Sequence, residues 1–562
     1  MYLRTTRRRN KDGSVVEYFQ LAHNERHPDT GKPVAKIIHN FGRTDNLDRD
    51  SLVRLCRSIA RVCDLTVIDP HDKDNAIQPN GGTYLPDNLK IERTVGFGTV
   101  LVIEALWDII GLKKTFLDIA KTNGLPECYE RALFAMTANR LCAPDSKLGV
   151  WERWLDTVYL PSCSELKLRH MYEAMDMLHT NIAEVEKTVF FHTANLFNLE
   201  VDLVFYDTTT ASFTTDYADD PDDPTTHLRQ YGHSKEGTWS TQVVVALAVT
   251  RDGIPVRSWV LPGNTSDVST VERVRTDLRG WNLGRALFVA DSGMNSEDNR
   301  SELARACGKY LLACRMANVA EIKREVLSKK GRYNVFDDNL QAKEVIVGDG
   351  ERRKRYILCF NPKEAKRQRK HRQDIVTLLE NELDSHSDTK ATSQWAIELL
   401  ASRRYKRYLK TTKSGHIRID RGAIREAAKY DGKWVLETND DTISLEDAAR
   451  GYKGLMVIER CFRSLKRTQI KMTPMYHWLS HRIESHVKIC VLALMIERIA
   501  ERTCDRTWSQ IRRALEALQV TQFFDLNHRV HIRNEIASDT RNILKKLKIP
   551  IPKQLVRIVK QP

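Results

Sequence analysis

Two short apolar segments, each followed directly by an aspartate, constrain the fold of this chain more than any other feature. Val201–Tyr206 precedes Asp207 in D-L-V-F-Y-D, and Arg285–Ala290 precedes Asp291 in A-L-F-V-A-D. Short β-branched and aromatic runs of this kind are typical of buried strands. Two carboxylates at the ends of adjacent buried strands repel each other unless a metal ion lies between them. An aspartate after a strand is also a common turn former, so one such residue alone decides nothing.

The sequence around these segments predicts an α/β sheet. Gln242–Val249 and Ile254–Leu261 flank Arg251-Asp252-Gly253, the pattern of a β-hairpin with a tight turn. Further elements follow in alternation: a helix at Val268–Arg279, a helix at Ser296–Ala306, and strands at Tyr310–Cys314 and Trp434–Glu437. A meander of strands followed by alternating helices and strands is an α/β pattern.

The first 190 residues differ from this core. Three strands are predicted at Tyr2–Arg9, Val15–Leu21 and Lys32–Asn40, with Lys11-Asp12-Gly13 as the first turn. Apolar residues at helical spacing then predict helices at Ser51–Cys63, Val100–Ile110, Pro126–Leu141 and Met171–Phe190.

A third acid, Glu459, lies in a predicted helix over 451–468. Tyr452, Glu459 and Lys466 are seven residues apart, so they share one face, and Arg463 lies beside Glu459. A hydroxyl, a carboxylate and an ammonium on one stripe fit a face that binds metal and phosphate oxygens. The alternative is an ordinary amphipathic helix with a Glu–Arg pair, a contact that stabilises a helix by only ~0.3 kcal/mol.

Convergence of Asp207, Asp291 and Glu459 would create a metal centre. Carboxylate oxygens are hard ligands that suit Mg²⁺, with Mn²⁺ as a possible substitute. Two such ions about 3.5–4 Å apart activate a water or a 3′-hydroxyl and stabilise the leaving oxygen of a phosphodiester.

The net charge indicates the type of binding partner, and several motifs that the sequence lacks exclude other classes of protein. The chain has 562 residues, which predicts roughly three or four domains, and its net charge of +15 favours nucleic acid over a membrane surface. The longest apolar run, Ile489–Ile496, is far shorter than the ~20 residues of a membrane helix. The N-terminus has no apolar signal segment, the eleven cysteines include no C-x-x-C pair, and there is no phosphate-binding P-loop. Reduced thiols in a cytoplasmic protein are expected.

These motifs resemble the DDE-type transposases of bacterial insertion sequences, in the superfamily with the signature Y-(2)-R-(3)-E-(6)-K. Tyr452, Glu459 and Lys466 match that signature in register, and F-Y-D-T-T-T and F-V-A-D-S-G-M-N-S-E-D-N carry the two aspartates. Leu455 stands where the signature has arginine, and Lys453, Arg460 or Arg463 could supply the phosphate contact instead. The strand-rich N-terminus and the region 96–154, with R-L-C-A-P-D-S-K-L-G-V-W, also resemble one subgroup of these transposases.

The resemblance implies an RNase H-like catalytic core, a mixed sheet flanked by helices, that is interrupted by a large, mainly β insertion. The expected organisation is a strand-rich region 1–47, a helical DNA-end-binding region 48–195, core parts 196–315 and 431–510, a basic insertion 316–430 and a basic tail 511–562. It further implies a Mg²⁺-dependent enzyme of the nucleoid that acts on double-stranded DNA, both transposon ends and target, as a homodimer or higher synaptic complex, without a membrane partner. The catalytic and metal-binding residues would be Asp207, Asp291 and Glu459.

Other residues allow two interpretations each. Tyr231–Lys235 resembles a family segment beside the active site, so His233 and Lys235 either contact DNA phosphates or belong to a polar loop. Tyr452, Lys466, Arg460 and Arg463 are the remaining candidate DNA contacts. Trp239 either packs or stacks on a base, and the acidic run Asp216–Asp223 is expected to be a solvated loop. Basic runs at 352–372, 403–410 and 541–560 contact DNA if the family assignment holds and are otherwise solvated.

Two alternatives to a transposase remain open at the sequence level. The same carboxylates would serve an RNase H-like nuclease that cuts branched or damaged DNA without strand transfer. A DNA-binding regulator derived from a transposase would need no metal, although all three acids are present.

Overall fold

The computed structural model describes residues 2–10, 15–26, 33–43, 90–199, 201–386, 393–525 and 528–560, with short pieces at 54–55, 58–59, 76–77 and 85–86. The predicted turn Lys11–Gly13 and most of the predicted helix Ser51–Cys63 lie outside the described residues. The chain divides into two compact units, one made mainly of residues 1–91 and the other mainly of residues 92–559.

The N-terminal unit contains an antiparallel sheet in the order β1-β2-β3. Its strands are β1 (Tyr2–Arg9), β2 (Val15–Arg26) and β3 (Pro33–Arg43), which confirms the three predicted strands. The short strands β4 (Ala76–Ile77) and β5 (Leu85–Pro86) pair with each other.

The second unit begins with a helical region. Its helices are α2 (Gly98–Ile109), α3 (Leu112–Thr122), α4 (Cys128–Cys142), α5 (Lys147–Glu152), α6 (Leu168–Thr180) and α7 (Ile182–Leu196). The helix predicted over Met171–Phe190 is two helices, because Asn181 turns the backbone and its side-chain amide donates to the carbonyl of Met177, which closes α6. Helix α4 is buried on nearly all sides against α2, α3, α6 and α16 (Ser480–Cys504).

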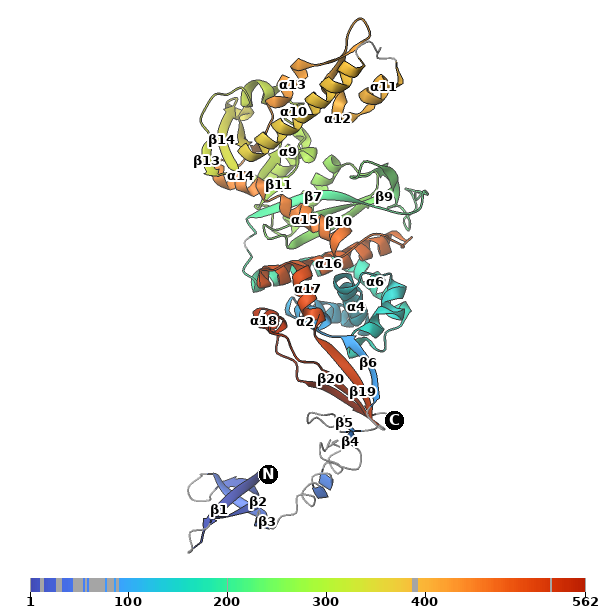
Figure 1. The fold of residues 1–562 in the computed structure, drawn as a ribbon, viewed down its shortest axis with the longest axis vertical. Coiled ribbons are helices and arrows are strands. Elements are labelled where there is room, and N and C mark those ends of the chain that lie inside the picture. The colour runs from blue at the N-terminus through green and yellow to red at the C-terminus, as the bar shows by residue number, and fades with distance from the viewer. Residues whose placement is uncertain are drawn as a thin grey trace. The chain divides into compact units, whose positions relative to one another are not determined.

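The centre of this unit is a ten-stranded mixed sheet, drawn in Figure 1. Its order is β10-β9-β7-β11-β12-β18-β15-β14-β13, with β8 paired to β9. Strand β7 is antiparallel to β9 and parallel to β11, β11 is parallel to β12, and β12 is antiparallel to β18. The bounds are β7 Leu203–Ser212, β8 Gln230–His233, β9 Trp239–Val249, β10 Pro255–Pro262, β11 Leu287–Ala290, β12 Tyr310–Ala313, β13 Asn334–Asp337, β14 Leu340–Val347, β15 Lys354–Phe360 and β18 Lys433–Thr438. The mixed α/β class is confirmed.

Each face of the sheet has its own core, because side chains alternate along every strand. On β7, Val204 and Tyr206 pack with α8 (Val271–Gly280) and α9 (Glu297–Ala304). Leu203 and Phe205 point to the opposite face, where α15 (Met456–Arg463) and α16 pack. Helix α16 lies between this face and the helices α4 and α6.

The region predicted as an insertion has two differently built parts. Strands β13, β14 and β15 extend the central sheet, because β15 pairs with β18 of the core. Residues 362–428 are mainly helical: α10 Pro362–Ser385, α11 Gln394–Ala401, α12 Arg403–Lys406 and α13 Arg421–Ala428, with the short strands β16 Leu409–Thr411 and β17 Ile417–Ile419. This second part has a small core of its own. The family-based expectation of a mainly β insertion therefore fits only its first part.

The segment predicted as a basic tail contains regular structure. Its elements are α17 (Trp508–Glu516), β19 (Gln519–Asp525), β20 (His528–Arg533), α18 (Ser538–Lys546) and β21 (Leu555–Lys560). These strands form a sheet in the order β21-β20-β19-β6, with β6 at Lys90–Gly96. Among the described residues, no helix is both long and apolar enough to cross a membrane.

Candidate active site

The two predicted aspartates lie level with each other on neighbouring parallel strands. Phe205 of β7 pairs with Val289 of β11, and Asp207 and Asp291 each follow that pair by two residues. Neighbouring strands are about 4.8 Å apart, and a step of two residues returns a side chain to the same face. Strand β7 continues beyond Asp207 because it stays paired with β9, so Asp207 lies inside a strand and only Asp291 follows a strand end.

Asp207 is held in an environment that disfavours its charge. Burial, with a smaller contribution from the neighbouring carboxylates of Asp267 and Asp291, raises the pKa of Asp207 to about 6. The backbone N–H of Thr208, which donates to its Oδ1, and the ammonium of Lys235 lower that pKa in part. A cation beside Asp207 would offset the remaining free-energy cost of ionising this buried carboxyl group.

Tyr452 joins this pair from α14 (Leu445–Lys453). Its hydroxyl donates to Asp291 Oδ1 over 3.1 Å. Burial raises the pKa of Tyr452, and the carboxylates of Asp291, Glu459 and Asp207 add to that rise. All three predicted catalytic acids therefore lie within electrostatic reach of one hydroxyl group.

Two glycines allow this helical segment to lie directly against β7. A Cβ added at Gly454 would be 2.7 Å from the ring of Phe205, and one added at Gly451 would be 3.2 Å from Leu203. Because both strand residues precede Asp207, this contact sets the distance between the acid-bearing strand and the helix that carries Glu459.

The helix predicted over 451–468 is broken into three pieces. Helix α14 ends at Lys453, α15 carries Glu459, and a π-helical turn over Ser464–Thr468 carries Lys466. Glu459 is exposed, whereas Ile458 and Phe462 of the same helix are buried. The expected single stripe is therefore divided: Tyr452 contacts Asp291 and lies within electrostatic range of Glu459, whereas Lys466 pairs with Glu236.

Lys466 and Leu455 take up roles that the spacing does not reveal. Lys466 Nζ donates to Glu236 Oε1 over 3.1 Å, and Arg467 donates to the same oxygen over 3.0 Å. Leu455 is buried in the main core, so the signature's arginine position is an apolar contact here. Arg460 and Arg463 are exposed, and neither pairs with a carboxylate of the described residues.

Asp267 is a nearby acid that the sequence reasoning missed. Its Oδ2 accepts from Lys235 Nζ over 2.5 Å, and its Oδ1 accepts from the Thr208 hydroxyl. Thr208 follows Asp207 directly, so this network reaches the candidate site from the other face of β7. A weak signal was available, because Asp267 lies in the G-N-T-S-D segment that follows the strand β10.

His233 and Lys235 line a cavity of about 640 Å³ together with Asp267, Tyr231 and Trp239. The rings of Tyr231 and Trp239 are exposed and stacked, with centroids 5.8 Å apart and planes 21° apart. The ring of His233 meets Trp239 edge-on. Thr210 and Val244 also line this cavity, so it opens on the face of the sheet opposite Asp207.

The acidic run beside β7 is only partly solvated. Asp219 is buried and forms an ion pair with the guanidinium of Arg229. Asp223 accepts hydrogen bonds from Thr225 and Thr226, which lowers its pKa to about 2. The expectation of a solvated loop fails for Asp219, because a buried arginine compensates its charge.

The donor types at the candidate site fit a hard divalent cation. Asp207, Asp291 and Glu459 offer only carboxylate oxygens, and a cation beside Asp207 would oppose the rise in its pKa that burial causes. Among the described residues, no three His, Cys, Asp or Glu side chains are placed closely enough to hold a metal ion in their present positions. The residue types therefore match Mg²⁺ or Mn²⁺, while the side-chain positions do not form a closed ligand set.

Comparison with known proteins gives two family matches. Residues 204–495, slightly more than half of the chain, match the family model described as transposase DDE domain. Residues 3–69 match the N-terminal domain of IS1634 family transposases. No curated protein matches this chain. Among solved structures, the cryo-EM structure of the piggyBac transposase synaptic complex with hairpin DNA aligns with a TM-score of 0.31 and 10% identity, covering 81% of this chain and 82% of that chain.

Proposed function

The chain belongs to the family of transposases with a DDE domain, and from that membership we propose that Asp207, Asp291 and Glu459 are its catalytic carboxylates. It is a DNA transposase of the insertion-sequence type. The observation that carries the residue assignment is the level placement of the two aspartates on β7 and β11. The hydroxyl of Tyr452, within reach of all three acids, supports the inclusion of Glu459.

An RNase H-like core is the fold that best fits the proposed site. Three antiparallel strands, β10, β9 and β7, are followed across the sheet by the parallel strands β11 and β12. Helices cover both faces of this part of the sheet. We propose that the core consists of residues 196–315 and 431–510, with 316–430 between them; the order of β7 and β9–β12 supports the first of these parts.

The residues of the chain prepare the site for the cation and the phosphodiester. Asp291 accepts the Tyr452 hydrogen bond at Oδ1, which orients the carboxylate that would hold the cation. Asp207 must lose its proton before it can act as a ligand. When bound there, Mg²⁺ or Mn²⁺ would stabilise charge on the phosphate and activate a water or 3′-hydroxyl nucleophile. Hydrolysis at the transposon end and attack of the freed 3′-hydroxyl on target DNA would use the same carboxylates.

Double-stranded DNA would be held by basic groups around these acids. Arg460 and Arg463 are exposed on the helix of Glu459. Lys466 borders the loop that carries His233 and Lys235, and its ion pair with Glu236 would exchange for a DNA phosphate. We assign end recognition to the helical region 48–195 and propose that two or more copies assemble on the inverted repeats. A DNA substrate would place the enzyme at the nucleoid.

Cleavage of inverted-repeat DNA in the presence of Mg²⁺ tests the assignment. The near-isosteric variant Asp291→Asn should reduce cleavage by at least about 1,000-fold, because one metal ligand is lost. Asp252→Asn is the matched control, because Asp252 is an exposed turn residue paired with Arg502. Undiminished cleavage by the Asp291 variant, with both proteins folded by circular dichroism, would show that the assignment is wrong.

Two further measurements separate the alternatives. Joining of a labelled 3′ end to target DNA excludes a nuclease without strand transfer. Calorimetric uptake of Mn²⁺ by the wild type, and its loss in Asp291→Asn, excludes a regulator that binds no metal.

A further inference from the structure

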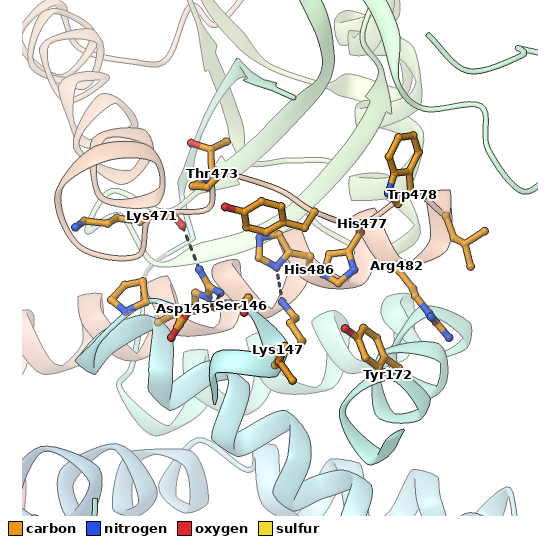
Figure 2. A pocket seen from close by; sticks show the side chains of 16 residues that line it. Asp145, Ser146, Lys147, Tyr172, Lys471, Thr473, His477, Trp478, Arg482 and His486 are labelled. Atoms are coloured by element: carbon orange, nitrogen blue, oxygen red, sulfur yellow. Dashed lines mark hydrogen bonds between the residues drawn. The ribbon is translucent and has the colours of Figure 1, made fainter. Parts of the chain in front are cut away.

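A second cavity, of about 550 Å³, lies in the same unit, and none of the proposed catalytic acids lines it. It is enclosed by the beginning of α5, by the segment 471–479 and by α16, as Figure 2 shows. The segment R-L-C-A-P-D-S-K-L-G-V-W, which carries family resemblance without an assigned role, supplies part of its wall.

Lys147 is a buried cation without an anionic partner. It is 4% exposed, and its Nζ donates to Nδ1 of His486 over 2.6 Å. His486 Nε2 lies 2.9 Å from the carbonyl oxygen of Met472, which can only accept, so Nε2 carries the ring proton and Nδ1 accepts. Burial lowers the pKa of both Lys147 and His486, so the neutral imidazole offers no charge to Lys147, and an anion in the cavity would favour the charged form of its amine.

Arg140 on α4 is a second buried basic group without an anionic partner among the described residues. It is 5% exposed, and its guanidinium donates to the backbone carbonyls of Lys471 and Asp145, which are neutral acceptors. No carboxylate among the described residues forms an ion pair with Lys147 or Arg140. A buried charge without a counter-charge is unfavourable, so both groups fit a site that an anion completes.

The acids near this cavity already have cation partners. Asp145 Oδ2 pairs with Arg153 over 2.9 Å, and its Oδ1 accepts from the backbone of Ser146. Asp176 pairs with Arg482 and His481. The remaining basic side chain at the wall, Lys471, is exposed, so the cavity is positively charged.

Two aromatic side chains on the 471–479 segment complete the cavity. Tyr476 is 66% exposed and Trp478 is 59% exposed, although both line it. One face of Trp478 is covered by the guanidinium of Arg229, 4.2 Å from the ring centroid. Exposed aromatic rings beside basic groups are the arrangement with which proteins bind nucleotides, because bases stack on the rings.

We propose that this cavity binds one nucleotide at the transposon end, with its backbone phosphate on Lys147 and Arg140 and its ring system against Tyr476 and Trp478. The inference rests on the proposed DNA substrate and adds a site separate from the catalytic carboxylates. It also explains why two buried cations are left without counter-charges.

The variant Lys147→Met tests the site, because methionine keeps the length of the side chain and removes the charge. Binding to an inverted-repeat duplex, followed by fluorescence anisotropy without divalent ions, should weaken about tenfold at 0.1 M salt. The slope of log K against log salt should fall by about 0.9, the value for one lost phosphate contact. Lys113→Met is the matched control, because Lys113 is exposed on α3 and its loss changes the net charge equally.

Thermal stability separates a binding role from a structural one. The melting temperature of Lys147→Met without DNA should equal or exceed that of the wild type, since a buried unpaired ammonium is removed. Millimolar inorganic phosphate should raise the melting temperature of the wild type and leave that of the variant unchanged. Unchanged DNA binding, or a fall in melting temperature that accounts for the weaker binding, would overturn the proposal.

The two proposals fail in different ways. If Asp291→Asn abolishes cleavage while Lys147→Met binds the duplex as the wild type does, only the nucleotide site is wrong. If the wild type neither cleaves nor prefers inverted-repeat DNA, the assignment of the substrate itself is wrong.

Discussion

At the scale of single residues, each of the two proposed sites contains a buried ionisable group without an ion-pair partner in the described part of the chain. Asp207 is a carboxyl whose pKa burial raises, and Lys147 is an ammonium whose pKa burial lowers. Most other buried charges of the described chain are paired, as Arg372 is with Asp431 through two hydrogen bonds of 2.5 Å. Where burial leaves a charge uncompensated, a cation or an anion from outside the chain is the natural counterpart.

Tyr452→Phe should lower cleavage by about 10- to 100-fold while the protein stays folded. The change removes only the hydroxyl that fixes the carboxylate of Asp291, and one hydrogen bond to a charged group is worth about 1.5–3 kcal/mol. Cleavage should recover partly at higher Mg²⁺ concentration, since the carboxylate is less well oriented rather than lost. Tyr217→Phe, at a highly exposed position, is the control and should match the wild type. A Tyr452 variant with wild-type cleavage at limiting Mg²⁺ would contradict a role in orienting Asp291.

Glu497 makes the stability of the protein depend on pH. Burial raises the pKa of Glu497 from 4.5 to about 7, and its Oε2 accepts from the Ser464 hydroxyl over 2.6 Å. Between pH 4.5 and 7 the folded protein keeps the proton on Glu497, whereas the unfolded chain releases it. The contribution of Glu497 to the free energy of unfolding is therefore fully present below pH 4.5 and is lost as the pH rises through 7. Glu497→Gln should raise the free energy of unfolding at pH 8, by no more than about 3 kcal/mol, and change it little at pH 4.5. Equal effects at both pH values in urea unfolding would contradict the raised pKa.

At the scale of elements, the site depends on how closely one helical segment approaches one strand. Gly454 lies against the ring of Phe205, two residues before Asp207. It also lies at the break between α14 and α15, so it separates the helix of Tyr452 from the helix of Glu459. A spacing of seven residues places Tyr452 and Glu459 on one side of this segment, and the turn at Gly454 lies between them.

Gly454→Ala should destabilise the protein by about 1–3 kcal/mol and reduce cleavage more than stability accounts for. The added methyl group would be 2.7 Å from the Phe205 ring, so α15 must move away from β7 and take Glu459 with it. Gly280→Ala is the control, because a Cβ at this helical glycine meets no atom within 4 Å. Urea unfolding together with cleavage under folded conditions measures both effects. A Gly454 variant as active as the Gly280 variant would show that the close contact does not position Glu459.

At the scale of the whole molecule, the central sheet joins the core and part of the insertion into one structure. Strand β18 pairs with β12 on one side and with β15 on the other, and Thr438 is paired with Leu311 and with Arg355. Residues 362–428 lie outside this sheet and have their own apolar cluster. The part of the insertion that unfolds independently of the core should therefore begin near residue 361 rather than near residue 316.

Native-state hydrogen exchange tests this boundary. Backbone amides of β15 and β12 should exchange with similar protection, because β18 must separate from both before either is released. Amides of α10–α13 should exchange through a separate opening with a lower free energy. Exchange of β14 and β15 together with α10–α13, ahead of β12, would show that the insertion is one independent domain.

The sequence by itself determined the elements and the chemistry. Apolar β-branched runs indicated the strands that carry or precede Asp207 and Asp291, and the residue types alone indicated hard cations and phosphates. These features are local, because strand preference and ligand chemistry depend on a residue and its near neighbours. The order of the three acids could also be read from the sequence, and the resemblance to the family was based on it.

Only the tertiary structure decided which residues meet. The register of β7 against β11 places the two aspartates level, and the close contact at Gly454 brings Glu459 toward them. Asp267 joins through the Thr208 hydroxyl, and Arg140 reaches the carbonyl of Lys471, 331 residues away in the chain. Register and packing depend on every strand and helix of the sheet at once, and no short stretch of sequence contains that information.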